Sequence, residues 1–308
     1  DKGVLKGLIL PSGATGIDRS KAKEYFQKAL DAYKELELIG YYSLYSENSD
    51  LSTNYSDLFQ KSEGNREIIL CRDYDGKIFQ NDFTSKVICA ELRAGLKTGC
   101  ELNPVLNLVN DYEKYSTRRK EPINPYVGAI QNERMADGLS TLSYKVYDKA
   151  NDIFADRDPR LAGTILFPGS SFRGVQLDFR AGLAIKQSTG YDFKTVDQME
   201  NIEKPIGMHN GVQITGKEGP HRTSTNISHS GFLMRKFTDV NGGSEAKGAS
   251  TVPYVIFRYA EVLLNTAEAA FYLSEDGVDA YDGKNTRNLS LECINKVRER
   301  AGGAAFKI

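Results

Sequence analysis

The sequence lacks tryptophan, contains only three histidines and carries almost no net charge. The formal net charge of −1 comes from 40 basic and 41 acidic residues, so no overall basic field is present to offset phosphates. Because nucleic-acid-binding domains normally carry such a field, that class is disfavoured. No apolar run approaches the roughly 20 residues that span a bilayer as a helix. With 40% hydrophobic and 26% charged residues, the 308-residue chain is typical of one large globular core or two modest domains.

Cysteine is also scarce, and its spacing excludes the common cysteine motifs. None of the four cysteines forms a CxxC pair, and no histidine follows at zinc-finger spacing. Buried free thiols are therefore favoured over a disulfide, with Cys89 and Cys100 as the only plausible local pair. The four are Cys71, Cys89, Cys100 and Cys293. The histidines, at 209, 221 and 229, are too far apart for a compact zinc site, so we expect them on the surface.

Helical periodicity is clear in three segments. Residues Asp18–Ile39 carry one apolar stripe, with Asp18 or Ser20 available as an N-cap and Gly40 as the stop. Tyr259–Leu273 keeps helical spacing for nearly four turns. A second stripe, Leu289 to Ala301, follows a polar link and stops at a Gly-Gly pair. The last two segments predict an αα-hairpin, the unit of TPR-like helical stacks, although no internal repeat is visible.

The rest of the chain predicts short elements between long loops. Aromatic and apolar runs predict strands, whereas Gly-, Ser- and Pro-rich stretches predict loops. The expected strands are Glu67–Cys71, Leu161–Phe167 and Gly231–Phe237, and a short helix is expected within Pro104–Tyr112.

Two strings near the C-terminus resemble the signature of the SusD/RagB family of outer-membrane nutrient-binding lipoproteins from Bacteroidetes. They are Arg258–Asn265 (RYAEVLLN), continued by Ala267–Ala269, and Ile294–Gly302 (INKVRERAG). Weaker similarities fall in the family's order along nearly the whole chain, at Glu67–Leu70, Asn103–Pro104, Asp158–Leu161, Gly231–Phe232 and Arg235–Phe237. The paired strings are the specific part of this resemblance.

The resemblance implies a mainly α fold: TPR-like helical packing, as in the SusD-like α-α superhelix, with long loops and a few short β-strands. It implies a single SusD-like domain over residues 1–308 that lacks the N-terminal part, with its lipidated cysteine, and the extreme C-terminus. The implied function is capture of an oligosaccharide or polysaccharide at the cell surface, without catalysis. Delivery would be to a SusC-like TonB-dependent transporter in the outer membrane, to which a lipid anchor absent from this chain would attach the protein. No cofactor is implied, although some relatives hold a structural Ca²⁺, and the alternative ligand is a peptide.

The polar, aromatic segment Arg72–Phe83 is the predicted ligand-binding region. Sugars stack their C–H faces on aromatic rings and form paired hydrogen bonds with planar side chains. The loop after the equivalent strand contributes to the ligand surface in the family. Since this chain has no tryptophan, there are three alternatives to the tryptophan platforms of many glycan-binding members: tyrosine or phenylalanine replaces them, the platform lies in the missing part, or the ligand is not a glycan. The candidates are Tyr74, Phe79, Gln80, Asn81 and Phe83. A solvent loop with anchoring aromatics is an equal alternative.

Several charged residues admit a catalytic interpretation that we disfavour. Arg258, Glu261, Glu268, Arg298 and Arg300 are expected to form ion pairs that fix a helix crossing, because a buried charge must be paired.

Other carboxylates admit an equally local interpretation. Asp158 and Arg160 are expected to pair across a turn at Pro159 rather than act as a glycosidase site with Asp156. Asp73, Asp75 and Asp82 could hold Ca²⁺ but lack EF-hand spacing. Asn124 and Tyr126 are weaker ligand candidates.

Two rivals come from other classes. A glycoside hydrolase would need a pocket motif tied to a pair of carboxylates, and none is visible. A purely structural TPR scaffold would show more repeats and fewer aromatic loops.

Overall fold

The computed structural model describes residues 19–123, 149–180, 182–189, 191–195, 208–209, 212–213, 216–219 and 226–308. The chain divides into two compact units. Unit 1 consists of Asp1–Glu47, Glu63–Cys71 and Val255–Ile308, and unit 2 consists of Asn48–Ser62 and Arg72–Tyr254. The predicted single domain is not tested by this division.

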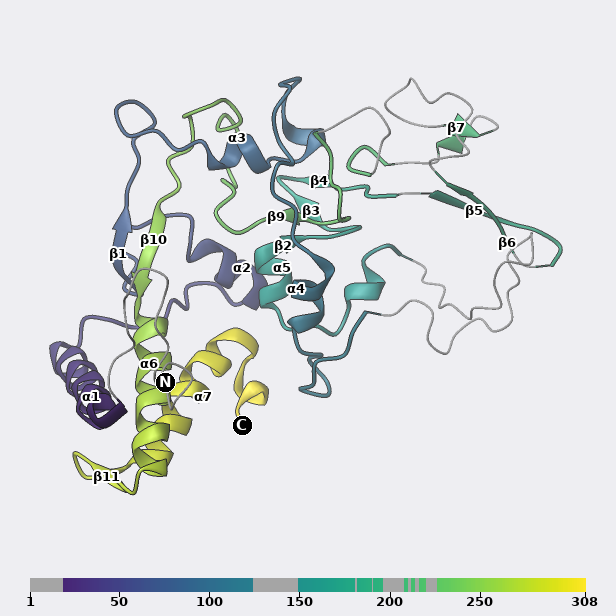
Figure 1. Ribbon diagram of the computed structural model, residues 1–308. Helices are drawn as coiled ribbons and strands as arrows, with labels where there is room; N and C mark the ends of the chain where they lie inside the picture. Colours follow the sequence, from purple (N-terminus) through teal and green to yellow (C-terminus); the bar gives the residue numbers. More distant parts are fainter. Residues whose placement is uncertain are drawn as a thin grey trace. The chain divides into compact units, whose positions relative to one another are not determined.

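Unit 1 is built on three long helices, α1 (Ala22–Ile39), α6 (Tyr259–Glu275) and α7 (Thr286–Gly302). Helix α6 packs against both α1 and α7 (Figure 1). Their buried stripes share one core, in which Ala267 and Ala270 are almost completely buried and permit a close helix approach. The predicted helices and the αα-hairpin are confirmed.

The ends of these helices follow capping chemistry. Gly40, at φ 65°, ends α1 in the left-handed conformation that glycine adopts without a Cβ clash. The side chain of Asn285 caps α7 by accepting a hydrogen bond from the backbone N–H of Asn288. The predicted Ser20 cap of α1 is wrong, because Ser20 lies inside a 3₁₀ turn, η1 (Arg19–Lys21), and Lys21 occupies the N-cap position. The other candidate cap, Asp18, lies outside the described residues.

The link between α6 and α7 folds into a small hairpin. Strands β11 (Ala280–Tyr281) and β12 (Lys284–Asn285) are antiparallel, with Tyr281 opposite Lys284. Both turn residues, Asp282 (φ 49°) and Gly283 (φ 74°), have the positive φ that a tight two-residue hairpin turn requires.

A two-stranded sheet leads directly into α6. Strand β1 (Ile68–Arg72) pairs with β10 (Tyr254–Arg258), which runs directly into α6. The predicted strand over Glu67–Cys71 is thus confirmed with a shift of one residue. The backbone N–H of Tyr259 donates to the carbonyl of Glu67 at 2.8 Å, so the first turn of α6 is tied to the start of β1.

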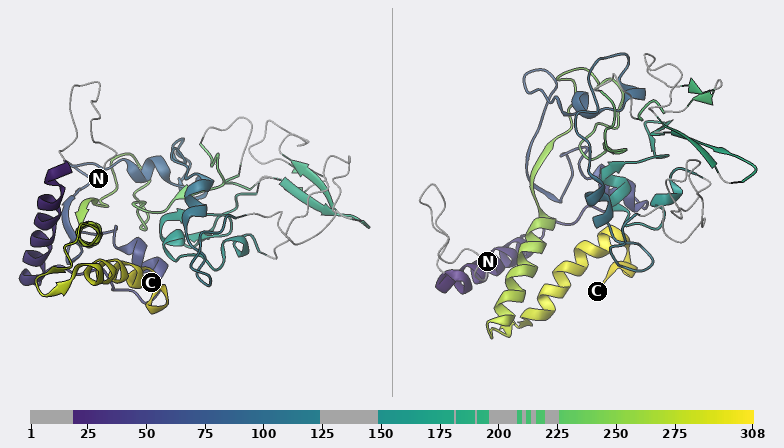
Figure 2. Two further views of the ribbon diagram at one scale, coloured as in Figure 1. Left: turned by 60° about the horizontal axis from the view of Figure 1, so that its bottom comes forward. Right: turned by 45° about the vertical axis from the view of Figure 1, so that its right-hand side comes forward.

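Unit 2 is made of short elements connected by long loops. Its helices are α2 (Leu51–Asp57), α3 (Phe83–Val87), α4 (Leu106–Asp111) and α5 (Arg160–Thr164), with 3₁₀ turns η2 (Ala90–Leu92) and η3 (Asp152–Phe154). Its antiparallel pairs are β2 (Ile165–Leu166) with β9 (Leu233–Met234), β3 (Ser171–Phe172) with β4 (Val175–Gln176), β5 (Gly182–Lys186) with β6 (Tyr191–Thr195), and β7 (Met208–His209) with β8 (Val212–Gln213). Figure 2 shows the long β5–β6 hairpin in both of its views.

The predicted mainly α architecture therefore describes unit 1 better than the described part of unit 2. The expected strand over Leu161–Phe167 is largely wrong, because α5 occupies its first half. The Asp158 carbonyl accepts the N–H of Leu161 and its carboxylate accepts the N–H of Arg160, which starts a helical turn. Gly163 then fits closely against α2, where a Cβ would lie 2.7 Å from the Ser52 carbonyl oxygen.

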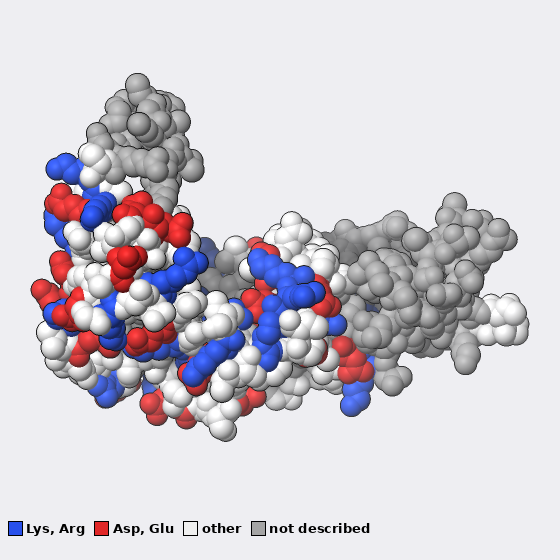
Figure 3. All heavy atoms as spheres, turned by 90° about the horizontal axis from the view of Figure 1, so that it is seen from below, with Lys and Arg blue, Asp and Glu red and all other residues white. Residues whose placement is uncertain are grey.

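The surface is charged but mixed in sign. Figure 3 shows basic and acidic side chains interspersed over the described part of the face in view. Within the described residues, no helix combines the length and apolar character needed to cross a membrane.

Candidate functional site

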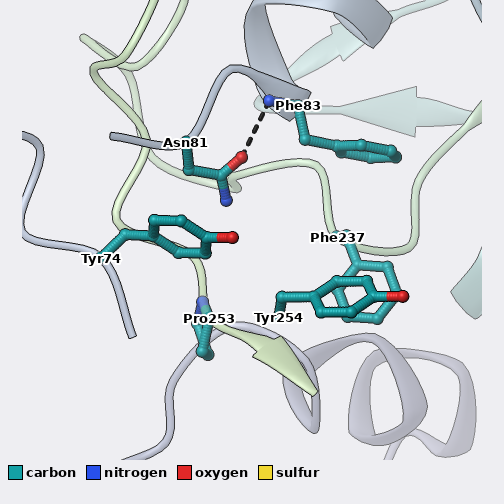
Figure 4. Close-up of a pocket in the computed structure, with 6 residues that line it drawn as sticks. All are labelled: Tyr74, Asn81, Phe83, Phe237, Pro253 and Tyr254. Atoms are coloured by element: carbon teal, nitrogen blue, oxygen red, sulfur yellow. Dashed lines mark hydrogen bonds between the residues drawn. The ribbon is translucent and has the colours of Figure 1, made fainter. Parts of the chain in front are cut away.

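An aromatic pocket of about 200 Å³ lies within unit 2. Its lining comes from two segments far apart in sequence, together with the turn after β9. The six lining residues are Tyr74, Asn81, Phe83, Phe237, Pro253 and Tyr254. In Figure 4 the Tyr74 hydroxyl points toward the middle of this group, with Asn81 and Phe83 on one side and Tyr254 beside Phe237 on the other. We call this group the aromatic pocket.

The loop that contributes Tyr74 is held by a carboxylate. Oδ1 of Asp75 accepts hydrogen bonds from the backbone N–H groups of Lys77 (2.8 Å), Ile78 (2.9 Å) and Phe79 (2.9 Å). These bonds stabilise the ionised form and hold the pKa of Asp75 below its usual value. The loop is therefore an organised turn rather than an unstructured excursion.

Asn81 joins this loop to the segment before β10. Its Nδ2 donates to the Val252 carbonyl at 2.8 Å, and its Oδ1 accepts the N–H of Phe83 at 2.8 Å. It also forms isolated β-bridges with Ala249 and Ser250. Asn81 consequently fixes the spacing between the two walls of the aromatic pocket.

Phe237 forms the far wall in an unusual backbone conformation. Its φ of 66° lies in the left-handed region, which is uncommon for a bulky residue and is tolerated where the surroundings hold it in place. Its ring contacts those of Tyr254 (centroids 5.7 Å apart), Phe83 (6.2 Å) and Phe59 (5.0 Å). This network of rings rigidifies the wall.

The structure brings together three of the five predicted ligand residues, Tyr74, Asn81 and Phe83. Phe79 and Gln80 do not line the aromatic pocket. Phe79 is 53% exposed at the loop tip, and Gln80 packs against Gly248. The ligand role of all five residues stays a prediction.

Phe237, Pro253 and Tyr254 were not predicted. Phe237 ends a segment that resembles a strand, and the other two directly precede the signature helix. No local pattern marks them, because they meet the loop only through pairing across about 170 residues of sequence, as in the Asn81 to Val252 bond (separation 171).

Two cations lie against the rings of this region. The guanidinium of Arg72 is 5.6 Å from the Tyr74 ring centroid and 5.7 Å from that of Phe79. The ammonium of Lys236 is 4.2 Å from the ring centroid of Phe59 and 5.2 Å from that of Phe237. Both positions are cation–π contacts with ring faces.

The calcium alternative finds no support in the described geometry. Asp75 is committed to the loop backbone, and Asp82 lies 4.0 Å from the ammonium of Lys247. Among the described residues, no group of three or more His, Cys, Asp or Glu side chains is placed to hold a metal ion. His229 is exposed; the side chain of His209, all of His221, and the weaker ligand candidates Asn124 and Tyr126 lie outside the description.

The arginines of the signature strings make structural contacts, but the sequence named the wrong carboxylates as their partners. Glu67, fully buried in unit 1, accepts hydrogen bonds from Arg258 (2.6 Å), Arg300 (2.6 Å) and the backbone N–H of Tyr45 (2.7 Å). The predicted partners Glu261 and Glu268 are exposed on α6, because they lie opposite its buried stripe.

The remaining charged residue of that set, Arg298, is also engaged. It donates to the carbonyl of Phe306 at 2.6 Å. The local pair at the Asp-Pro-Arg turn is confirmed, since Arg160 and the almost fully buried Asp158 form a 2.5 Å ion pair.

The cysteines are free thiols, as expected. Cys89, Cys100 and Cys293 are buried, whereas Cys71 is partly buried. Burial raises the pKa of Cys89 and of Cys100 to about 12, so both are unreactive thiols at neutral pH. Beside them, buried Glu218 accepts the N–H groups of Ala90 and Glu91, each at 2.7 Å, and burial raises its pKa.

Comparison with known proteins gives a consistent result. The sequence matches the model of the SusD family over residues 66–307. The fold is similar to that of a SusD-like carbohydrate binding protein from Bacteroides fragilis NCTC 9343 (TM-score 0.57, 23% identity), with 94% of this chain and 43% of that chain covered. It is also similar to a second SusD-like protein from the same organism (TM-score 0.50, 21% identity), with 92% and 45% covered. The chain thus spans less than half the length of these structures. No curated protein matches the sequence.

Proposed function

Because the chain belongs to the SusD family, we propose that it is a non-enzymatic surface protein that captures an oligosaccharide or polysaccharide. It delivers this ligand to a SusC-like TonB-dependent transporter, and a lipid anchor holds it at the outer membrane. Its helices α1, α6 and α7 form the TPR-like scaffold. The carbohydrate-binding name of one structural neighbour supports the glycan ligand, and membership of the SusD family supports the rest of the proposal.

The observation that carries the proposal is the aromatic pocket. Five of its six lining residues are rings, counting Pro253, and the sixth is an amide. Rings stack on the C–H faces of sugars, and phenol hydroxyls bond to sugar hydroxyls. Three of the residues lie in the segment that the sequence assigns to ligand binding.

Binding without catalysis is supported by the chemistry of the lining. Most glycosidases place two carboxyl groups about 5–9.5 Å apart around the scissile bond. None of the six residues that line the aromatic pocket is a carboxylate. The pocket can therefore hold a sugar but has no acid–base pair of its own.

Calorimetric titration against a panel of plant, host and microbial glycans, with product analysis of the same samples, tests the proposal. We expect binding without release of shorter products. Tyr74→Ala should weaken binding, whereas Tyr25→Ala, which removes a 49% exposed tyrosine from α1 in unit 1, should not. Turnover would contradict the proposal, and binding of peptides alone would replace the glycan as ligand.

The partner is tested separately. A SusC-like transporter from outer membranes should co-purify with the lipid-anchored full-length protein. Recovery of the protein alone, under conditions that keep such transporters intact, would contradict the delivery step.

A further inference from the structure

We propose that the aromatic pocket selects an uncharged sugar ring and discriminates against rings that carry a carboxylate or a sulfate. This inference rests on the proposed glycan-binding function and narrows its ligand class. Three observations support it: the six lining residues are uncharged, the cations beside their rings are already engaged, and the pocket volume matches one sugar ring.

The lining residues carry no charge. Tyr74, Phe83, Phe237, Pro253, Tyr254 and Asn81 supply ring faces, phenol hydroxyls and one amide. A carboxylate that enters such a space loses part of its hydration and meets no charged side chain among the six lining residues, which is costly. A sugar hydroxyl loses much less, because one neutral hydrogen bond replaces another.

The two cations that lie against rings of the pocket are already engaged. Arg72 and Lys236 each lie against two aromatic rings, within 5.7 Å of the ring centroids. Recruiting either cation to an acidic ligand would cost these cation–π contacts. Two carboxylates of the same loop, Asp75 and Asp82, are used by the loop backbone and by Lys247.

The amide of Asn81 is committed to the architecture of the pocket by its bonds to Val252 and Phe83. The Tyr74 hydroxyl points toward the middle of the group and makes no hydrogen bond with the described residues (Figure 4). It is therefore the polar group best placed for a ligand. A phenol can donate to and accept from a neutral hydroxyl.

The volume fits one ring. A cavity of about 150 Å³ in another protein holds a benzene molecule, and the aromatic pocket measures about 200 Å³. One six-membered sugar ring fits this space, and the neighbouring units of a chain would extend over the exposed ring of Tyr254, which is 55% exposed.

The test compares matched oligosaccharide probes by calorimetry: galactose oligomers against galacturonate oligomers, and glucose oligomers against glucuronate oligomers, of equal length and linkage. We expect at least one neutral probe to bind at least tenfold more tightly than its acidic counterpart, with little dependence on salt between 50 and 200 mM. Equal or tighter binding of the acidic probe, with affinity that falls as salt rises, would overturn the inference and leave glycan binding intact. Failure of these probes and of every saccharide in the wider glycan panel to bind would refute the proposed function, and the inference with it.

Two variants locate the effect. Tyr74→Phe removes only the hydroxyl and should weaken the neutral probe several-fold while the protein keeps its melting temperature. Tyr254→Arg places a cation at the exposed edge and should reduce the preference for the neutral probe. If Tyr254→Arg leaves the ratio of affinities unchanged, the selectivity does not arise in this pocket and the inference fails.

Discussion

Replacement of the buried carboxylate of unit 1, Glu67→Gln, gives a sharp prediction. The side chain is fully buried and accepts hydrogen bonds from two guanidinium groups, of Arg258 and Arg300. Glutamine keeps the shape and one acceptor oxygen but removes the negative charge. The two cations are then left without their counter-ion, and the side chain of Arg300 is only 4% exposed.

The expected cost follows from that burial. Removal of one partner of a buried ion pair destabilises proteins by about 3–5 kcal/mol. Because the Arg258 side chain is 23% exposed and can be partly rehydrated, we expect the lower end of that range, about 3 kcal/mol. At roughly 2–4 °C for each kcal/mol in a chain of this size, the melting temperature should fall by about 6–12 °C.

Circular dichroism at 222 nm is the suitable assay, because the three long helices belong to unit 1 and dominate its signal. Thermal melts of the wild type, Glu67→Gln and the control Glu268→Gln should be compared. Glu268 is exposed on α6, so its variant should change stability by no more than about 0.5 kcal/mol. Equal melting temperatures for the two variants would refute the assignment of Glu67 as the charge that joins β1 to the helix pair.

Three further predictions concern the loop, the pocket and the helix end. Tyr74→Ala should lower glycan affinity by about tenfold or more, since a buried aromatic anchor contributes on the order of 1–3 kcal/mol to binding. Phe79→Ala should change the affinity little, because the Phe79 ring lies outside the aromatic pocket. The pKa of Asp75 is lower in the folded protein than its unfolded value of 3.8, so its stabilisation of the loop is complete above pH 3.8 and is lost as the pH falls through the folded pKa. Glycan affinity should therefore decline only below about pH 3.8. Asp75→Ala, which removes the carboxylate, should weaken binding at neutral pH. Gly302→Ala should lower the free energy of unfolding by about 1–3 kcal/mol in a urea titration, because the added Cβ would lie 2.3 Å from a buried phenylalanine ring; an unchanged midpoint would show that this ring moves freely.

The long helices were predictable because periodicity is a local property of the sequence. The stripe of α6 identifies its buried face, and the Gly-Gly pair marks the end of α7. The strand predicted over Leu161–Phe167 was largely wrong for a physical reason. A short apolar run does not distinguish a buried strand from a buried helical turn. There the Asp158 carboxylate, as acceptor for the Arg160 N–H, favours the turn.

The charged residues show a second limit. The signature string contains two arginines that do form buried ion pairs, but their partner Glu67 is separated from them by 191 and 233 positions. Helical spacing ranks nearby carboxylates first, and these are the ones that α6 turns toward solvent. A correct principle, that buried charges are paired, therefore led to the wrong partners.

The same limit applies to the aromatic pocket, our candidate ligand site. The loop was predictable because its aromatics and amides lie together in sequence, yet a loop alone presents only one wall. The second wall is created where Asn81 bonds to Val252 and thereby brings Pro253 and Tyr254 opposite Tyr74. Because Asn81 holds this junction, we assign it a positioning role, and the proposed selectivity rests on the uncharged rings that it brings together.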